Sequence, residues 1–241
     1  MPPLLEVCVG DPESLSAAIE GGADRIELCS TLELGGLTPP PGLLALAARA
    51  PVPVYAMIRP RGGDFVFSAA ERAAMLADIA AVRAAGLAGV VLGASLSDGS
   101  LDADALGELA GASRGLGTTL HRAFDLVPDI DAAIETAVAL GFERILTSGR
   151  APRAIDGVAD LRRAQDAAAG RIGIMAGSGL GPDTVAALLA AVPLAEVHGT
   201  CSRAAGVLNP RAAAFGFATA PPRRTSADEV RRMKAALRAA S

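Results

Sequence analysis

Short runs of β-branched and aliphatic residues alternate along the chain with longer runs rich in alanine and leucine, at a spacing of roughly 30 residues. The short runs have the length and composition of buried strands, and the longer runs have those of helices. Strict alternation of the two predicts a parallel sheet whose strands are joined by helical crossovers. The eight predicted strands are Leu4–Val9, Arg25–Ser30, Val52–Arg59, Gly89–Ser95, Gly117–Phe124, Glu143–Gly149, Arg171–Gly177 and Leu194–Gly199.

The longer runs carry residues that begin and end helices. Pro12 and Pro182 stand near the first helical position, where the missing N–H of proline costs nothing. Ser68 followed by Glu71 forms a capping-box pattern, and Gly86 follows a run where a left-handed cap is expected. The predicted helices are Pro12–Gly21, Pro40–Ala50, Ala69–Ala85, Asp102–Ser113, Pro128–Leu140, Ala154–Ala167, Pro182–Ala191 and Ser226–Ala239.

Eight strand–helix units predict an α/β fold, namely a single (β/α)8 TIM barrel. We expect residues 1–241 to form this one domain. The alternative is an open, doubly wound sheet. Its dinucleotide fingerprint GxGxxG is missing, because the first strand is followed by Val9-Gly10-Asp11-Pro12. Two insertions, Pro60–Phe67 and Thr200–Thr225, follow the third and eighth strands, so they are expected on the active face of the barrel.

Polar residues alternate with aliphatic ones on the first, second and eighth strands. Side chains two apart share a face, so the pattern Glu-x-Cys, Glu-x-Cys and Glu-x-His belongs to one face of three strands that barrel closure makes neighbours. The aliphatic residues between them should pack on the helices, which leaves the polar set pointing into the barrel. The predicted inward residues are Glu6, Cys8, Glu27, Cys29, Glu196 and His198.

Interior carboxylates cost stability unless they are paired, so their presence favours a functional site over a purely structural interior. Cys8 and Cys29 lie on adjacent strands about 5 Å apart, and two thiolates suit a soft ion such as Cu(I). No CxxC or HExxH spacing indicates a zinc site. A small buried hydrophobic role stays open for each cysteine taken alone.

Charged side chains also gather where the third and fifth strands end. Arginines there either neutralise a buried glutamate or clamp an anionic substrate, and both interpretations stay open. Acid–base work by a histidine or by a glutamate with a raised pKa is a further possibility. The candidate catalytic residues are Glu6, Glu27, Arg59, Arg61, Asp64, His121, Arg122, Asp125 and His198.

Small residues follow the sixth and seventh strands. Backbone N–H groups can approach an anion closely at such turns, and barrel enzymes often hold phosphate near strands seven and eight. Ser148, Gly149, Gly177 and Gly179 are therefore candidates for an anion or cofactor site, although glycine after a strand is also ordinary turn chemistry. The Gly-Ser-Gly here is not the GxSxG elbow of a serine hydrolase.

Composition narrows the possible partners and the compartment. The net charge is −4, with no tryptophan and one tyrosine, which argues against nucleic acid as a partner. No basic n-region begins the chain and no apolar run approaches the length of about 20 residues that spans a bilayer, so neither a signal peptide nor a membrane anchor is expected. Three widely spaced cysteines do not make a disulfide framework, which predicts a cytoplasmic protein.

The segments LLEVCV, GGADRIELCS, GGLTP, IRPRGGDF, LHRAFD, ERILTSG, IMAGSG and EVH closely resemble the CutC family of cytoplasmic copper-homeostasis proteins. The similarity runs in order from Leu4 to about His198. It implies a (β/α)8 barrel that forms homo-oligomers, either dimers or tetramers, and Cu(I) binding through the cysteines that match Cys8 and Cys29. The stretch Gly199–Pro222, which contains Cys201, departs from the family pattern.

Two functions therefore compete. The first is copper homeostasis, with Cu(I) bound by the inward cysteines at the barrel mouth. The second is an uncharacterised barrel enzyme that acts on a small anionic metabolite, phosphorylated compounds included, because copper binding gives no reason for three arginines and two histidines at the mouth. A scaffold with an idle pocket is a third interpretation, which the destabilising interior charges oppose.

Overall fold

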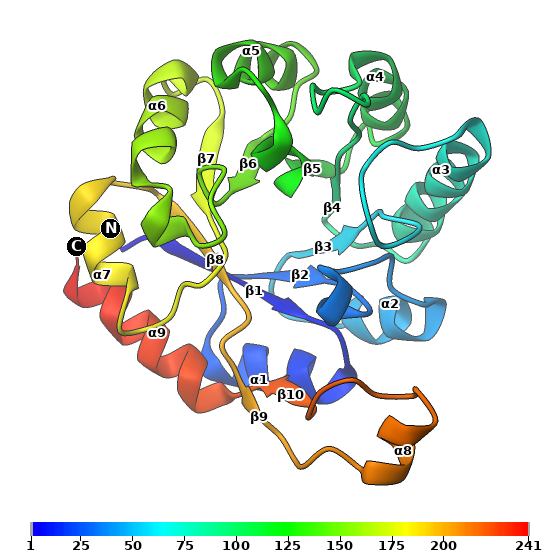
Figure 1. Ribbon diagram of the computed structural model, residues 1–241, viewed down its shortest axis with the longest axis vertical. Helices are drawn as coiled ribbons and strands as arrows, with labels where there is room; N and C mark the ends of the chain where they lie inside the picture. Colours follow the sequence, from blue (N-terminus) through cyan, green and yellow to red (C-terminus); the bar gives the residue numbers. More distant parts are fainter. Residues whose placement is uncertain (1, 241) are drawn as a thin grey trace.

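The computed structural model describes residues 2–240 and has eight parallel strands closed into a barrel, with helices around it (Figure 1). Each strand pairs with the next, and the eighth pairs with the first, so the (β/α)8 prediction is confirmed and the open sheet is excluded. The strands are β1 (Leu4–Val9), β2 (Arg25–Leu28), β3 (Val54–Met57), β4 (Gly89–Leu92), β5 (Gly117–Leu120), β6 (Arg144–Thr147), β7 (Gly173–Ala176) and β8 (Glu196–Gly199).

Helices follow the strands on the outside of the barrel (Figure 1). Within residues 2–240, none of them combines the length and the apolar character that crossing a membrane requires. The helices around the barrel are α1 (Pro12–Gly21), α2 (Pro41–Ala47), α3 (Ala69–Ala84), α4 (Ala103–Ala112), α5 (Ile130–Ala139), α6 (Val158–Ala168), α7 (Val185–Ala191) and α9 (Ala227–Ala239). Short 3₁₀ segments are η1 (Leu32–Leu34), η2 (Arg122–Leu126) and η3 (Ala154–Asp156).

The predicted boundaries are right where capping residues define them. Ser68 and Glu71 form the expected capping box of α3, and Pro12 is the first residue of α1. Helix α7 begins at Val185 and not at Pro182, because residues 182–184 form a turn. Most predicted strands run too far toward the mouth, since the chain leaves the sheet and turns soon after the last paired residue; Arg122, for example, begins η2.

The alternation of faces is as predicted. Leu5, Val7 and Val9 of β1 are completely buried in the main core between the barrel and the helices. A smaller cluster around Cys29 and Met57 fills part of the barrel interior. The period-2 pattern therefore separates the helix-facing side of each strand from the interior.

The register of the barrel offsets the two cysteines. Cys8 of β1 pairs with Glu27 of β2, so Cys29, the residue after the end of β2, stands two residues farther toward the mouth. On the other side of β1, Glu6 pairs with His198 of β8. This stagger is the shear that barrel closure requires, so Cys8 and Cys29 are not the paired neighbours that a separation of about 5 Å between adjacent strands implies.

A polar cluster fills the interior near the first residues of the strands. Arg25 of β2 and Arg144 of β6 place their guanidinium carbons 5.5 and 4.9 Å from the centre of the Tyr55 ring. Both arginines pair with Glu196, and the Tyr55 hydroxyl donates to Glu143 at 3.0 Å. Paired charges therefore close this end of the barrel.

The long segment before α9 forms an arm that projects from the barrel (Figure 1). Strands β9 (Ser202–Ala204) and β10 (Arg223–Thr225) pair antiparallel at its base, and α8 (Pro210–Ala214) lies at its tip. Val207, Phe215 and Phe217 are highly exposed on this arm, and the rings of Phe215 and Phe217 stack 6.0 Å apart.

Candidate metal and ligand site at the barrel mouth

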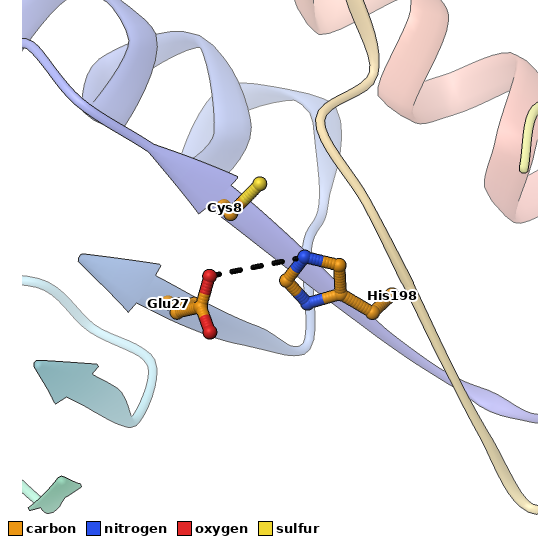
Figure 2. A group of neighbouring side chains, drawn as sticks. All are labelled: Cys8, Glu27 and His198. Carbon is orange, nitrogen blue, oxygen red and sulfur yellow. Dashed lines mark ion pairs between the residues drawn. The ribbon is translucent and has the colours of Figure 1, made fainter. Parts of the chain in front are cut away.

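Cys8, Glu27 and His198 converge inside the barrel from β1, β2 and β8 (Figure 2). One ligand atom from each, the sulfur, a carboxylate oxygen and a ring nitrogen, lie within 4.8 Å of one another. All three side chains are buried. Thiolate, imidazole and carboxylate are the donors that transition metals take in proteins, so this group can hold a metal ion.

Glu6 lies beneath this group and holds the imidazole of His198 in place. Its Oε1 lies 2.9 Å from Nδ1 of His198, and its Oε2 accepts from Nε of Arg25. Burial by itself would raise the pKa of Glu6, but the bond from His198 and the charge of Arg25 lower it to about 2. Glu6 is therefore a carboxylate at neutral pH.

His198 is the positive member of the group. Burial would lower its pKa, but the charges of Cys8 and Glu27 and the hydrogen bond to Glu6 raise it well above its ordinary value. Nε2 of His198 lies 3.8 Å from Oε2 of Glu27. The raised pKa favours the protonated ring, with Nδ1 toward Glu6 and Nε2 toward Glu27, so the ring must release a proton before it can coordinate a metal.

Glu27 also joins Cys29 to the group. Oε2 of Glu27 lies 3.5 Å from the sulfur of Cys29, which is completely buried. Burial raises the pKa of both groups, and the carboxylate raises that of Cys29 further. The two sequence-predicted metal ligands thus both lie close to Glu27.

A cavity of about 380 Å³ opens above these side chains. Of the nine candidate catalytic residues, five line it: Glu27, Arg59, His121, Arg122 and His198. Its apolar walls come from the side chains of Leu32, Met57, Phe65, Leu146 and Leu180. The cavity is much larger than a metal ion and has the size of a small-molecule site.

Arg59 lines the cavity and is not paired with a buried glutamate, which was one of the two interpretations of the sequence. Its guanidinium lies over the ring of Phe65, 4.9 Å from the ring centre. Phe65 in turn contacts His121, with ring centres 4.6 Å apart. The buried Glu6 and the half-buried Glu196 are instead paired with Arg25.

Arg61 and Asp64 lie outside the cavity lining. Arg61 binds Asp64 at 3.0 Å and also bonds to the capping residue Glu71 of α3. Its guanidinium lies 5.3 Å from the ring centre of Phe67. These two candidates therefore hold the loop after β3 against α3.

The carboxylate of Asp125, a residue of η2, binds the turn after β6, where an external anion was expected. Its carboxylate accepts from the N–H groups of Ser148 and Arg150, at 3.0 and 3.1 Å from Oδ1, and from Nε of Arg122 at 2.7 Å. The N–H of Gly149 donates to Thr147. The N–H groups of Ser148 and Gly149 are therefore already bound within the chain.

The other two residues expected at the anion site, Gly177 and Gly179, have different positions relative to the cavity. Gly179 lines the cavity, whereas Gly177 makes room for the site: a Cβ there would lie 2.6 Å from Leu146 and 3.2 Å from the His198 ring. Cys201 is half-buried outside the cavity lining, and burial raises its pKa to about 12.

Sequence reasoning gave no role to Arg25 and Arg144. Both are the first residues of their strands, and Arg25 is in phase with Glu27 and Cys29. The alternation rule that found the glutamates therefore also predicts an inward Arg25, which identifies the partner of Glu6.

Three comparisons relate the chain to known proteins. The CutC family model matches residues 3–203. A family protein CutC of Rhizobium meliloti is 58% identical over 233 residues, which cover 97% of this chain and 95% of the relative. One of Caulobacter vibrioides is 52% identical over 238 residues, covering 98% of this chain and 97% of the relative. A solved structure from Streptococcus agalactiae, named as a copper homeostasis protein CutC, is 32% identical with a TM-score of 0.79, covering 83% of this chain and 99% of that one.

Proposed function

Because the chain belongs to the CutC family, we propose that it is a copper homeostasis protein that binds Cu(I) as its cargo through Cys8 and Cys29 at the barrel mouth. The observation that carries this proposal is the convergence of Cys8, Glu27 and His198 within 4.8 Å, with the sulfur of Cys29 against Glu27. Soft thiolate donors favour Cu(I) over hard divalent ions.

The charges around the two thiols support a monovalent ion. Two thiolates and one Cu(I) carry a net charge of −1, which the neighbouring ring of His198 offsets when it keeps its second proton. Burial and the carboxylate of Glu27 raise the pKa of Cys29, so binding must release a proton from this thiol. The sulfur of Met57, which lines the cavity beside the buried Cys29, supplies a further soft donor.

Titration of the reduced protein with Cu(I), against a chromophoric chelator of known affinity, tests the proposal. Cys8→Ser and Cys29→Ser should each lower the affinity by more than about a hundredfold, since even residues that only support a ligand cost 10- to 100-fold. Cys201→Ser is the matched control and should bind as the wild type does, because Cys201 neither belongs to the group of Cys8, Glu27 and His198 nor bonds to Glu27 as Cys29 does. Unchanged affinity in Cys8→Ser would refute the proposed ligand set.

The cellular compartment that we propose follows from the need to keep the copper-binding thiols reduced. Cys8, Cys29 and Cys201 are free cysteines in the structure. Copper binding by Cys8 and Cys29 requires that they stay reduced, which the cytoplasm ensures. We therefore place the protein in the cytoplasm as part of this proposal.

Self-association into homodimers or homotetramers completes the proposed function. The projecting arm carries Phe217, which is 83% exposed, beside Phe215, and paired exposed aromatic rings are typical of a surface that a second copy covers. Light scattering should give a mass that is a multiple of 24.1 kDa. Phe217→Ser should shift the protein toward the monomer, whereas Leu126→Ser, exposed at the end of η2, should not. An unchanged oligomer in Phe217→Ser would contradict the arm as the interface.

A further inference from the structure

Arg59 carries a buried positive charge that no carboxylate in residues 2–240 neutralises within 4.0 Å. Its Nη1 donates to the carbonyl groups of Leu34 and Gly36 at 2.8 and 3.1 Å, and its Nη2 to that of Gly63 at 2.8 Å. Its Nε is buried without an acceptor. A buried guanidinium is costly without a counter-ion, so this wall of the cavity lacks an anion.

His121 also lines the cavity and carries a second buried donor without an acceptor. Its Nδ1 accepts from the N–H of Ala123 at 3.1 Å, so Nε2 carries the proton of the neutral ring. Burial and the charge of Arg59 lower the pKa of His121 to about 3, which keeps the ring neutral at physiological pH. Nε2 is buried and has no acceptor in the described chain. Phe65, in contact with both side chains, places the two donors on one wall.

We propose that this wall binds the carboxylate group of a small organic acid, with Nε of Arg59 and Nε2 of His121 as the donors. One uncompensated positive charge and two free N–H groups match a monoanion with two oxygens. A phosphate dianion would leave a negative charge and at least one oxygen unbound. The site uses neither Cys8 nor Cys29, so it goes beyond the proposed copper function.

The remaining walls describe the rest of the ligand. Oε1 of Glu27 is a third buried atom without a partner, and Glu27 lines the cavity from β2. Apolar side chains such as Leu32 and Leu146 also line the cavity. The ligand is therefore a carboxylic acid with an apolar body and a second hydrogen-bonding group for Glu27, small enough for about 380 Å³.

Binding of defined probes to the metal-free protein tests this site. Benzoate and 4-hydroxybenzoate have the required shape, their primary amides are matched neutral controls, and inorganic phosphate tests the competing anion. Isothermal titration and thermal shift should show that both acids bind and raise Tm, with 4-hydroxybenzoate tighter. The amides and phosphate should bind at least about tenfold more weakly than the acids, because they lose or mismatch the charged bond. No binding by either acid, or equal binding by amide or phosphate, would overturn the proposal.

Two substitutions of His121 separate binding from folding. His121→Asn keeps an acceptor near the N–H of Ala123 and removes the Nε2 donor, so it should fold normally and bind 4-hydroxybenzoate about 10- to 100-fold more weakly. His121→Gln places an amide donor near the position of Nε2 and should restore part of that loss. Arg163→Ala, a substitution of an exposed residue paired with Asp131, is the surface control and should bind as the wild type does. Wild-type affinity in a folded His121→Asn protein would reject the role of His121.

Discussion

Replacing Glu6 by glutamine is expected to lower the free energy of unfolding by about 3–5 kcal/mol. Glu6 is completely buried between Nε of Arg25 and Nδ1 of His198, the latter 2.9 Å away. The substitution keeps the shape of the side chain and removes its charge. Arg25 then retains only Glu196, and the imidazolium of His198 loses its nearest carboxylate. The loss therefore comes from two buried cations whose charge is no longer balanced.

The same substitution should change the dependence of stability on pH. The pKa of Glu6 is lowered from an ordinary value of 4.5 to about 2 in the folded protein. The unfolded chain therefore binds the proton first on acidification. The stabilisation by Glu6 is fully present above pH 4.5 and is lost progressively as the pH falls toward 2. Glu6→Gln has no such proton to bind, so its stability should fall less steeply over this range.

Urea unfolding followed by circular dichroism at pH 7, 4 and 3 measures both effects. Glu135→Gln is the matched control, because Glu135 pairs with Arg171 on the surface and is 62% exposed. Its loss should stay within about 1 kcal/mol, as is usual for exposed ion pairs. Equal losses in the two variants, or an unchanged acid limb in Glu6→Gln, would show that the buried network contributes little.

The barrel and the direction of its interior side chains could be predicted from the sequence because both follow from simple periods. A period of two assigned Glu6 and Cys8 to the interior of β1, and eight units implied that β8 closes on β1. Those two inferences alone bring His198 next to Glu6, as the structure does. The sequence alone therefore predicts which polar side chains meet in the barrel interior.

The height of each residue in the barrel could not be predicted in the same way. Alternation fixes a face, but the shear that pairs Cys8 with Glu27 and leaves Cys29 farther along depends on closure of the whole sheet. The hydrogen bonds formed by the turns could not be predicted from the sequence either. The carboxylate of Asp125 folds back onto the N–H groups after β6, and such a bond between two loops leaves no pattern in either segment.

The two ends of the barrel interior thus differ in how completely their polar groups are paired. Near the first residues of the strands, charges are paired and tightly packed around Tyr55. At the mouth, Glu27, Arg59 and His121 keep unpartnered atoms, which is the arrangement expected where a ligand supplies the missing partners. The packed end sets the geometry from which Glu6 holds His198, so its integrity governs the site above it.

Gly117→Ala should therefore be strongly destabilising, by about 3 kcal/mol, although it adds one methyl group. A Cβ at Gly117 would lie 2.1 Å from the Tyr55 hydroxyl oxygen and 2.8 Å from a carboxylate oxygen of Glu143. The ring cannot move aside easily, because two guanidinium groups and the hydrogen bond to Glu143 hold it. Gly111→Ala, on α4 with open space around the added atom, is the control and should be neutral or stabilise by up to about 1 kcal/mol.

A double-mutant cycle with Tyr55→Leu identifies the cause. The shorter side chain removes the hydroxyl that the new methyl group would contact, so Gly117→Ala should cost much less in the Tyr55→Leu background. Urea unfolding of the four proteins gives a coupling energy, which we expect to reach about 1–3 kcal/mol, as for residues in direct contact. Additive losses within about 0.5 kcal/mol would mean that the glycine is required for the strand itself and not to accommodate Tyr55.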